Sequence, residues 1–301
     1  MNSDRAFAHE LEIAVAAAQA AGTILREAFN QPGGPTGTSE HADADRTAER
    51  AIREALGGAF PEDGFLGEEL ADARRAPGHT GRLWVVDPND GTTAYMKGFR
   101  GAATSIALLV RGEPVLGVVY AYNCPDDSGD LFAWAKGGPL LRNGAPADPH
   151  WPASPSRDGV VLVSQGADKS PEANAACVAP MRYRAVPGIA YRLALAAAGD
   201  GVGILVDKHR PEGRLGIAPA RGPVRFQSLE HRGQHFGNEH AFELPGHFLC
   251  LRARLHARHV GRKAGLLLRE NVDWRRGQRD VRHHITSISA CSAPDVFSAC
   301  R

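Results

Sequence analysis

The stretch Leu83–Arg100, L-W-V-V-D-P-N-D-G-T-T-A-Y-M-K-G-F-R, constrains this chain more than any other part of its sequence. It begins with a continuous apolar run, residues 83–86, which predicts a short strand covered on both faces. The strand ends on Asp87, the proline that follows opposes a helix, and residues 89–91 predict a turn that returns Asp90 beside Asp87. Two carboxylates at one point repel each other unless a hard divalent cation lies between them, so the sequence predicts a metal site.

The residues that follow this predicted turn suit a phosphate group. Backbone N–H groups of Gly91, Thr92 and Thr93, with a small hydroxyl side chain among them, can hold a phosphate next to the metal. The alternative is that D-P-N-D-G forms an ordinary surface turn. Two observations favour the site: the strand before it is too apolar to be exposed, and a second acidic group, Glu68 and Glu69, follows another short apolar pair upstream.

These motifs carry a family resemblance. G-E-E followed by W-V-V-D-P-x-D-G-T-T resembles the inositol monophosphatase family of magnesium-dependent, lithium-sensitive sugar-phosphate phosphatases, whose signature reads D-P-[LI]-D-G-T. The resemblance implies an α/β fold, a layered αβαβα sandwich of the sugar-phosphatase type, and a phosphoric monoester hydrolase that uses Mg²⁺. Asn89 replaces the Leu or Ile of the signature, a change that is tolerable because this position donates its backbone carbonyl to the metal.

The resemblance also implies roles for individual residues. One magnesium would lower the pKa of a bound water, which Thr92 and Asp45 orient, and another would stabilise the leaving oxygen during in-line displacement. The metal ligands implied are Glu68, Asp87, the carbonyl of Asn89, and Asp90; the catalytic residues are Thr92, Asp45 and Glu68; the substrate-binding residues are Gly91, Thr92, Thr93 and Arg192.

Two of these assignments have alternatives. Asp45 lies in A-D-x-x-x-E, which matches only half of a family motif that begins V-T, so a helix-capping Asp with no catalytic task remains open. Arg192 lies in a segment that looks like the family's G-S-x-[AG]-x-[KR] helix, where it would contact a phosphate or a sugar hydroxyl. It is equally a candidate for a solvated charge on the polar face of that helix, and the sequence alone slightly favours this second interpretation.

The substrate is expected to be a small phosphate ester, either an inositol phosphate or a related sugar phosphate. The segment Tyr95–Gly98, Y-M-K-G, departs from the N-F-x-H-G of inositol phosphatases and is closer to the E-F-I-K-R run of the related 3'(2'),5'-bisphosphate nucleotidases. A nucleotide is therefore the alternative substrate within the same enzyme class.

Hydrophobic periodicity predicts the order of the elements and three regions. The N-terminal metal- and phosphate-binding region spans residues 1–150, a partial C-terminal α/β domain spans 151–220, and an atypical basic tail spans 221–301. The helices are expected at 4–29, 43–56, 172–181 and 188–199, and the strands at 83–86, 103–110, 114–120, 131–134, 140–141 and 160–163, with tight turns at 111–113 and 143–144.

The resemblance ends after about residue 203. The family continues with W-D-x-A-A-G, whose Asp is a metal ligand, but Leu215 and Gly216 stand where the Trp and Asp would fall, and Asp207 and Glu212 are the nearby substitutes. The tail is rich in Arg, His and Gly, without an ordered nucleic-acid motif or interleaved aromatics, so nucleic-acid binding is not expected. A shifted reading frame explains this change in composition better than nucleic-acid binding does, and it implies disorder of the tail. The alternative to an active enzyme is a catalytically impaired remnant or a binding module.

Composition sets broad limits on the remaining possibilities. With 43% hydrophobic and 23% charged residues and a net charge of +1, the 301-residue chain has the composition of an ordinary globular enzyme. Its 5 cysteines are irregularly spaced and form no C-x-x-C pair, which argues against a disulfide framework and a zinc site and favours the cytoplasm. Neither a signal peptide nor a membrane span is expected, and a homodimer is left open as the assembly.

Overall fold

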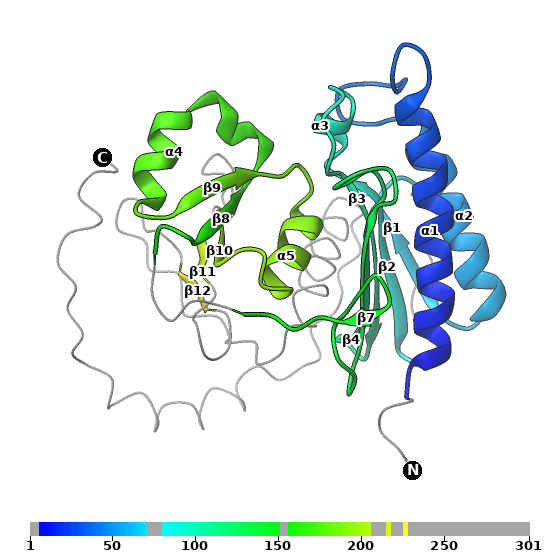
Figure 1. Cartoon of the computed structure of the whole chain (residues 1–301). Helices are drawn as coiled ribbons and strands as arrows, with labels where there is room; N and C mark the ends of the chain where they lie inside the picture. Colours follow the sequence, from blue (N-terminus) through cyan, green and yellow to red (C-terminus); the bar gives the residue numbers. More distant parts are fainter. Residues whose placement is uncertain (1–5, 71–79, 151–155, 206–214, 218–224, 228–301) are drawn as a thin grey trace, which may run out of the picture.

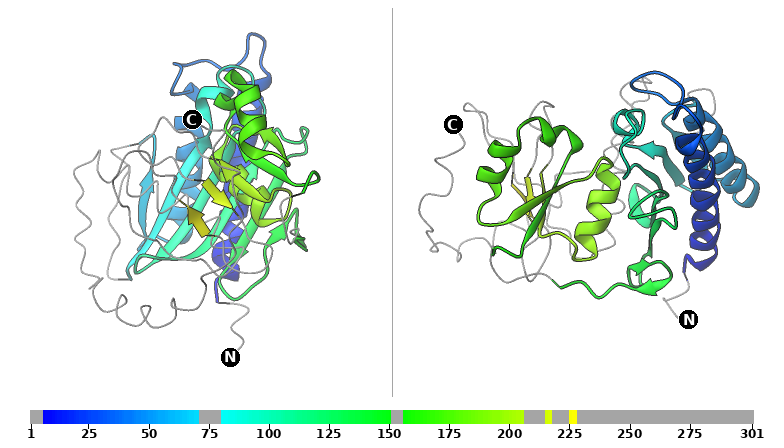
Figure 2. Two further views of the ribbon diagram at one scale, coloured as in Figure 1. Left: turned by 90° about the vertical axis from the view of Figure 1, so that its left-hand side faces the viewer. Right: turned by 45° about the horizontal axis from the view of Figure 1, so that its top comes forward.

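Helices and sheets alternate across the molecule in five layers (Figure 1). The computed structural model describes residues 6–70, 80–150, 156–205, 215–217 and 225–227, and within these residues it contains a seven-stranded and a five-stranded sheet. Two helices cover the outer face of the first sheet, one helix lies between the sheets, and another covers the far side of the second sheet (Figure 2). This order is the αβαβα sandwich expected from the sequence, whereas the predicted region boundaries at residues 150 and 220 remain predictions.

The outer helices are α1 (Ala8–Asn30) and α2 (Asp43–Ala59), which pack against each other and against the first sheet. Both were expected from apolar residues at helical spacing, and their buried positions follow that spacing. Small residues along α1 let the helix approach the sheet closely: a Cβ added to Gly22 would lie 2.8 Å from the Cβ of Tyr122. The buried residues are Ala14, Ala17, Ala18, Ala21, Gly22 and Leu25 in α1, and Asp45, Ala48, Glu49, Ile52 and Leu56 in α2.

The first sheet has its strands in chain order, with the first pair parallel and the others antiparallel. The two predicted tight turns are present, at Arg111–Gly112 with φ of 51° and 83°, and at Asn143–Gly144 with φ of 51° and 82°, the left-handed values that a two-residue hairpin turn requires. The strands are β1 (Gly64–Gly67), β2 (Arg82–Asp90), β3 (Ala103–Val110), β4 (Glu113–Ala121), β5 (Asp130–Ala135), β6 (Leu141–Arg142) and β7 (Ala145–Pro146).

The end of β2 differs from the sequence prediction. Instead of stopping at residue 86 before a turn, the strand continues to Asp90, which lies opposite Ala103, while Asp87 lies opposite Ser105. One extra residue is therefore accommodated between the two acids, a bulge that bends the strand and changes the direction of its side chains. Proline has no N–H to donate to the sheet, so Pro88 suits this irregular position, and its carbonyl instead accepts the Thr104 hydroxyl at 2.8 Å.

The second sheet has the order β12-β11-β10-β8-β9. The predicted strand at 160–163 and helices at 172–181 and 188–199 are present, the helices shorter than expected. Leu215 and Gly216 lie in a strand that pairs antiparallel with β10, whereas Asp207, Glu212 and residues 228–301 lie outside the described residues. The elements are β8 (Val160–Val163), a 3₁₀ helix (Gln165–Lys169), α4 (Pro171–Val178), β9 (Arg182–Ala185), α5 (Ile189–Ala197), β10 (Gly203–Leu205), β11 (Leu215–Ile217) and β12 (Arg225–Gln227).

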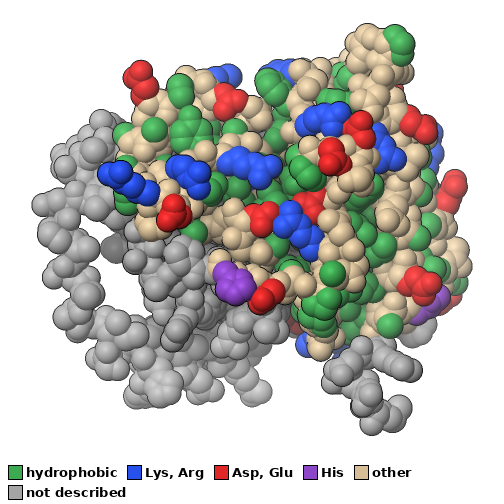
Figure 3. All heavy atoms as spheres, in the orientation of Figure 1, with side chains coloured by type: hydrophobic (Ala, Val, Ile, Leu, Met, Phe, Trp, Pro, Cys, Tyr) green, Lys and Arg blue, Asp and Glu red, His purple; other side chains and the backbone are tan. Residues whose placement is uncertain are grey.

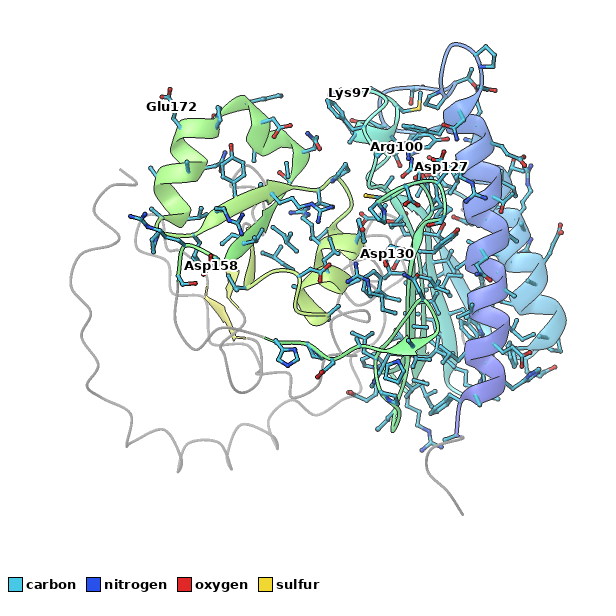
Figure 4. All side chains as sticks on the ribbon, in the orientation of Figure 1. Lys97, Arg100, Asp127, Asp130, Asp158 and Glu172 are labelled. Carbon is cyan, nitrogen blue, oxygen red and sulfur yellow. The ribbon has the colours of Figure 1, made fainter. Side chains whose placement is uncertain are left out.

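Helix α5 joins the two halves, since its apolar residues contact strands of both sheets. A polar network reinforces the junction (Figure 4). Asp130 of β5 accepts the Tyr191 hydroxyl of α5 at 3.0 Å and a bidentate pair of N–H bonds from Arg142, which also contacts Asp200 at 2.9 Å. Because the carboxylate of Asp130 is only 1% exposed, removing Arg142 would leave a buried charge without this partner, which is costly.

Candidate active site

The end of β2 places three buried polar residues next to the start of α5. Asp87, Asn89 and Asp90 are 2–4% exposed, and the Asp87 carboxylate accepts the backbone N–H of Asn89 at 3.1 Å. The Asp90 carboxylate accepts the N–H of Ala190, in the first turn of α5, at 2.5 Å. A carboxylate is favourable at a helix N-terminus, where N–H groups lack intrahelical acceptors, so Asp90 also fixes α5 against the first sheet.

Asp45 caps α2 and also contacts residues at the end of β2. Its carboxylate accepts the N–H of Ala42 at 2.9 Å, which is a cap of α2, and the side-chain amide of Asn89 at 2.8 Å, and it lies 3.5 Å from the Thr92 hydroxyl. Burial raises the pKa of Asp45 to about 7, and the negative charges of Glu69 and Asp87 act in the same direction. The capping Asp therefore also lies beside the acids at the end of β2.

Gly91 and the two threonines begin the short helix α3 (Thr92–Tyr95). Gly91 has φ of 106°, and a Cβ there would lie 3.1 Å from the backbone nitrogen of Gly188, so glycine suits both the backbone angle and the approach to α5. The Thr92 hydroxyl donates to the carbonyl of Asn89 at 2.8 Å. Thr92 is half-buried and Thr93 is exposed, and the first N–H groups of a helix have no intrahelical acceptor.

Glu49 is a buried residue of this region that the sequence analysis did not single out. Its carboxylate accepts the backbone N–H groups of Glu69 at 2.7 Å and Leu70 at 3.0 Å, and so fixes the acidic loop after β1. Burial raises the pKa of Glu49, and the two N–H groups act against this shift. The sequence could have indicated Glu49, because it is the last residue of A-D-x-x-x-E and lies one helical turn after Asp45 on the same face of the helix.

The acidic loop presents its two glutamates differently. Glu68, the expected ligand, is exposed, whereas the side chain of Glu69 is only 6% exposed and contacts His41 at 3.2 Å. Glu69 also raises the pKa of Asp45, so its carboxylate lies close enough to act on the acids at the end of β2. The structure thus brings Glu69 into the buried acidic group, and the role of Glu68 as a ligand remains a prediction.

Gly67 provides a test of how tightly Glu49 holds this loop. A Cβ at Gly67 would overlap the Glu49 carboxylate, which cannot withdraw without losing its two N–H bonds. We expect Gly67→Ala to lower the free energy of unfolding by about 2–3 kcal/mol in urea titrations. The control is Gly57→Ala in α2, where a Cβ meets nothing within 4 Å, and which should be stabilising by about 0.5–1 kcal/mol. Equal effects of the two changes would contradict the tight fit.

Comparison with known proteins agrees with this arrangement. The model of the inositol monophosphatase family matches residues 8–200, from α1 to the end of α5. The chain belongs to the inositol monophosphatase family. A histidinol-phosphatase of Chlorobaculum parvum is 32% identical over 160 residues, covering 52% of this chain and 59% of the relative. An inositol-1-monophosphatase of Rhizobium meliloti is 42% identical over 102 residues, covering 34% and 36%, respectively.

Solved structures of the family show the same fold. An inositol monophosphatase from Anabaena superposes with a TM-score of 0.53 at 26% identity, covering 68% of this chain and 77% of that protein. The extragenic suppressor protein suhB of Bartonella henselae superposes with a TM-score of 0.56 at 25% identity, covering 66% and 79%. The chain spans less than two thirds of the length of the two curated relatives named above.

Membership of the inositol monophosphatase family raises the question of whether the acids suit a metal. Within the described residues no group of three or more His, Cys, Asp or Glu side chains is arranged to hold an ion, and the ligand set of Glu68, Asp87, the Asn89 carbonyl and Asp90 remains a prediction. Backbone N–H groups contact Asp87 and Asp90 instead. The chemistry of the donor set nevertheless suits a hard cation, because burial and neighbouring acids raise the pKa of Asp45.

The position of Arg192 shows that one interpretation of the sequence, a solvated charge on the polar face of its helix, is wrong. It is only 4% exposed in α5, with its Nε 3.4 Å from the carbonyl of Gly188, so it is not a solvated charge on a polar face. The helix lies between the two sheets and has no solvent-facing side of the kind assumed from the sequence. Its assignment as a substrate-binding residue remains a prediction.

Proposed function

We propose that this chain is a magnesium-dependent phosphate monoester hydrolase that acts on an inositol phosphate or a related sugar phosphate. The supporting observation is that Asp87 and Asp90 at the end of β2 and Asp45 of α2 are buried, with the half-buried Thr92 hydroxyl 3.5 Å from Asp45, in a member of the inositol monophosphatase family. Such a cluster of acids is stable at neutral pH when a cation compensates its charge. Bound Mg²⁺ would supply an acidified water and charge stabilisation at the leaving oxygen.

Individual residues of the chain would have separate roles in the reaction. Asp45 and Thr92 would orient the attacking water, because the hydroxyl already lies 3.5 Å from the carboxylate and donates to the carbonyl of Asn89. The N–H groups of Gly91, Thr92 and Thr93 would bind phosphate oxygens at the start of α3. Arg192 would hold the substrate. The metal ligands proposed are Glu68, Asp87, the carbonyl of Asn89, and Asp90.

A second candidate substrate is histidinol phosphate. It is favoured by two relatives named histidinol-phosphatase, from Chlorobaculum parvum and Mycobacterium tuberculosis, the second 47% identical over 79 residues. Lys97 and Arg100 lie on the loop after α3 (Figure 4), and Arg100 pairs with Asp127 at 2.8 Å. On the face shown in Figure 3, Lys and Arg side chains lie among Asp and Glu side chains.

A phosphate-release assay tests the proposal. The panel contains inositol 1-phosphate, histidinol phosphate, a hexose phosphate and adenosine 3',5'-bisphosphate, each with and without Mg²⁺. We expect phosphate release to require Mg²⁺. Its rate should still rise at Mg²⁺ concentrations that saturate a protein carrying W-D-x-A-A-G, because one anionic ligand of that motif is missing from the sequence. Release that is insensitive to chelators would contradict the proposal. Binding of inositol phosphate without release would favour the impaired remnant or binding module.

Two further expectations belong to the proposal. We expect a location in the cytoplasm, which cell fractionation can test, and the homodimer that the sequence leaves open can be tested by sedimentation. In the part of the chain that the structure describes, none of the helices is both long and apolar enough to pass through a lipid bilayer.

A further inference from the structure

The side chain of Asn89 makes contacts that its proposed role as a carbonyl ligand does not need. It is 2% exposed, its Nδ2 donates to Oδ1 of Asp45 at 2.8 Å, and its Oδ1 accepts the hydroxyl of Tyr122 at 2.5 Å. A buried amide is costly unless its polar atoms are paired, and both ends of this one are. The amide therefore connects Asp45 on α2 with Tyr122, which follows β4.

The direction of these bonds is fixed when Asp45 is ionised. In that form, which orienting a water requires, the carboxylate only accepts hydrogen bonds, so the NH₂ group of Asn89 must face Asp45. The carbonyl oxygen of the amide then faces Tyr122, whose hydroxyl must donate to it. Asn89 cannot turn over without placing its carbonyl against the carboxylate, so Tyr122 and Asp45 together determine its orientation.

Tyr122 is itself held in place. It is fully buried, with its ring edge-on to Tyr95 at 6.3 Å between centroids, and Gly22 of α1 lies against its Cβ. The Tyr95 hydroxyl donates to the carbonyl of Leu25 at 2.8 Å, which ties this second ring to α1 as well. The hydroxyl of Tyr122 is thus a fixed point from which the amide of Asn89 is oriented.

We infer that Asn89 and Tyr122 are positioning residues that hold the Asp45 carboxylate in the orientation it needs toward the Thr92 hydroxyl. This inference rests on the proposed function. Asn89 holds Oδ1 of Asp45 in place. The other carboxylate oxygen, Oδ2, accepts the Ala42 N–H and lies 3.5 Å from the Thr92 hydroxyl. Displacing a reacting group by about 1 Å costs on the order of 100-fold in rate, so a fixed carboxylate matters for turnover.

The test separates positioning from stability. Asn89→Leu keeps the shape and the backbone carbonyl but leaves the Tyr122 hydroxyl and Oδ1 of Asp45 without this partner. We expect kcat to fall by about 10- to 100-fold, KM to change by less than about threefold, and the melting temperature to fall by roughly 5 °C. Adding Tyr122→Phe removes the stranded hydroxyl, so stability should largely return while kcat stays low.

The control is Tyr120→Phe, the same chemical change two residues earlier on β4, which should leave kcat unaltered. Recovery of kcat together with the melting temperature in the double variant would overturn the inference. Absence of phosphate release from the wild type on every substrate would instead count against the proposed function. In that case a crystal structure of the double variant decides: Oδ1 of Asp45 displaced by about 1 Å or more supports positioning, and an unmoved carboxylate overturns it.

Discussion

Asp90→Asn should reduce kcat/KM for phosphate release by roughly 10²- to 10³-fold and weaken Mg²⁺ binding measured by calorimetry. The change removes a negative charge from the proposed metal site while keeping the shape of the side chain. Asparagine retains an oxygen that can accept the N–H of Ala190, so the contact with α5 should persist. The loss therefore reports on charge rather than on the fold, and the free energy of unfolding without metal should change by less than about 1 kcal/mol.

Asp127→Asn is the matched control for this experiment. The side chain of Asp127 is 60% exposed and pairs with Arg100, so its neutralisation should leave Mg²⁺ affinity within about twofold. The pair Glu68→Gln and Glu69→Gln then distinguishes the glutamate favoured by the sequence from the one buried in the structure. Unchanged Mg²⁺ affinity in Asp90→Asn would show that the proposed metal site is wrong.

The sequence predicted the main elements of the first half because their signals are local. Apolar residues at helical spacing marked α2, and a turn of Arg and Gly between two apolar runs marked the β3–β4 hairpin. The continuation of β2 to Asp90 was missed, because a bulge is determined by pairing with β3 rather than by the residues of β2 alone. Local patterns thus locate elements better than they locate their irregular ends.

The site was predicted less completely, for the same physical reason. Asp87, Asn89 and Asp90 share one strand end and were found together, whereas the partners of Asn89 are 44 and 33 residues away in sequence. Only the fold brings those partners to the amide. The burial of Arg192 likewise depends on the second sheet, which covers α5 on the side that an isolated helix would expose to solvent.

The stability of the metal-free protein should depend on pH through Asp45. In the unfolded chain this carboxyl ionises near its usual pKa of 3.8, whereas burial raises the pKa in the folded protein to about 7. Between these values folding takes up a proton, so stability falls as the pH rises, by up to roughly 4 kcal/mol across the window. Urea unfolding in a chelator at pH 5 and pH 8 samples about two pH units of this window, so stability should be higher at pH 5 by up to roughly 3 kcal/mol.

Magnesium should reverse this trend, because a dication favours the ionised forms of the neighbouring acids. Below pH 7, the apparent affinity for Mg²⁺ should rise about tenfold with each unit of increasing pH for every proton that the metal displaces. Mg²⁺ should therefore raise the melting temperature little at pH 5.5 and strongly at pH 8. Asp45→Asn removes the titrating carboxyl and should flatten both profiles, whereas Asp43→Asn, an exposed acid in the same turn of α2, should leave them unchanged. Equal Mg²⁺ stabilisation at both pH values in the wild type would show that Asp45 does not sense the metal.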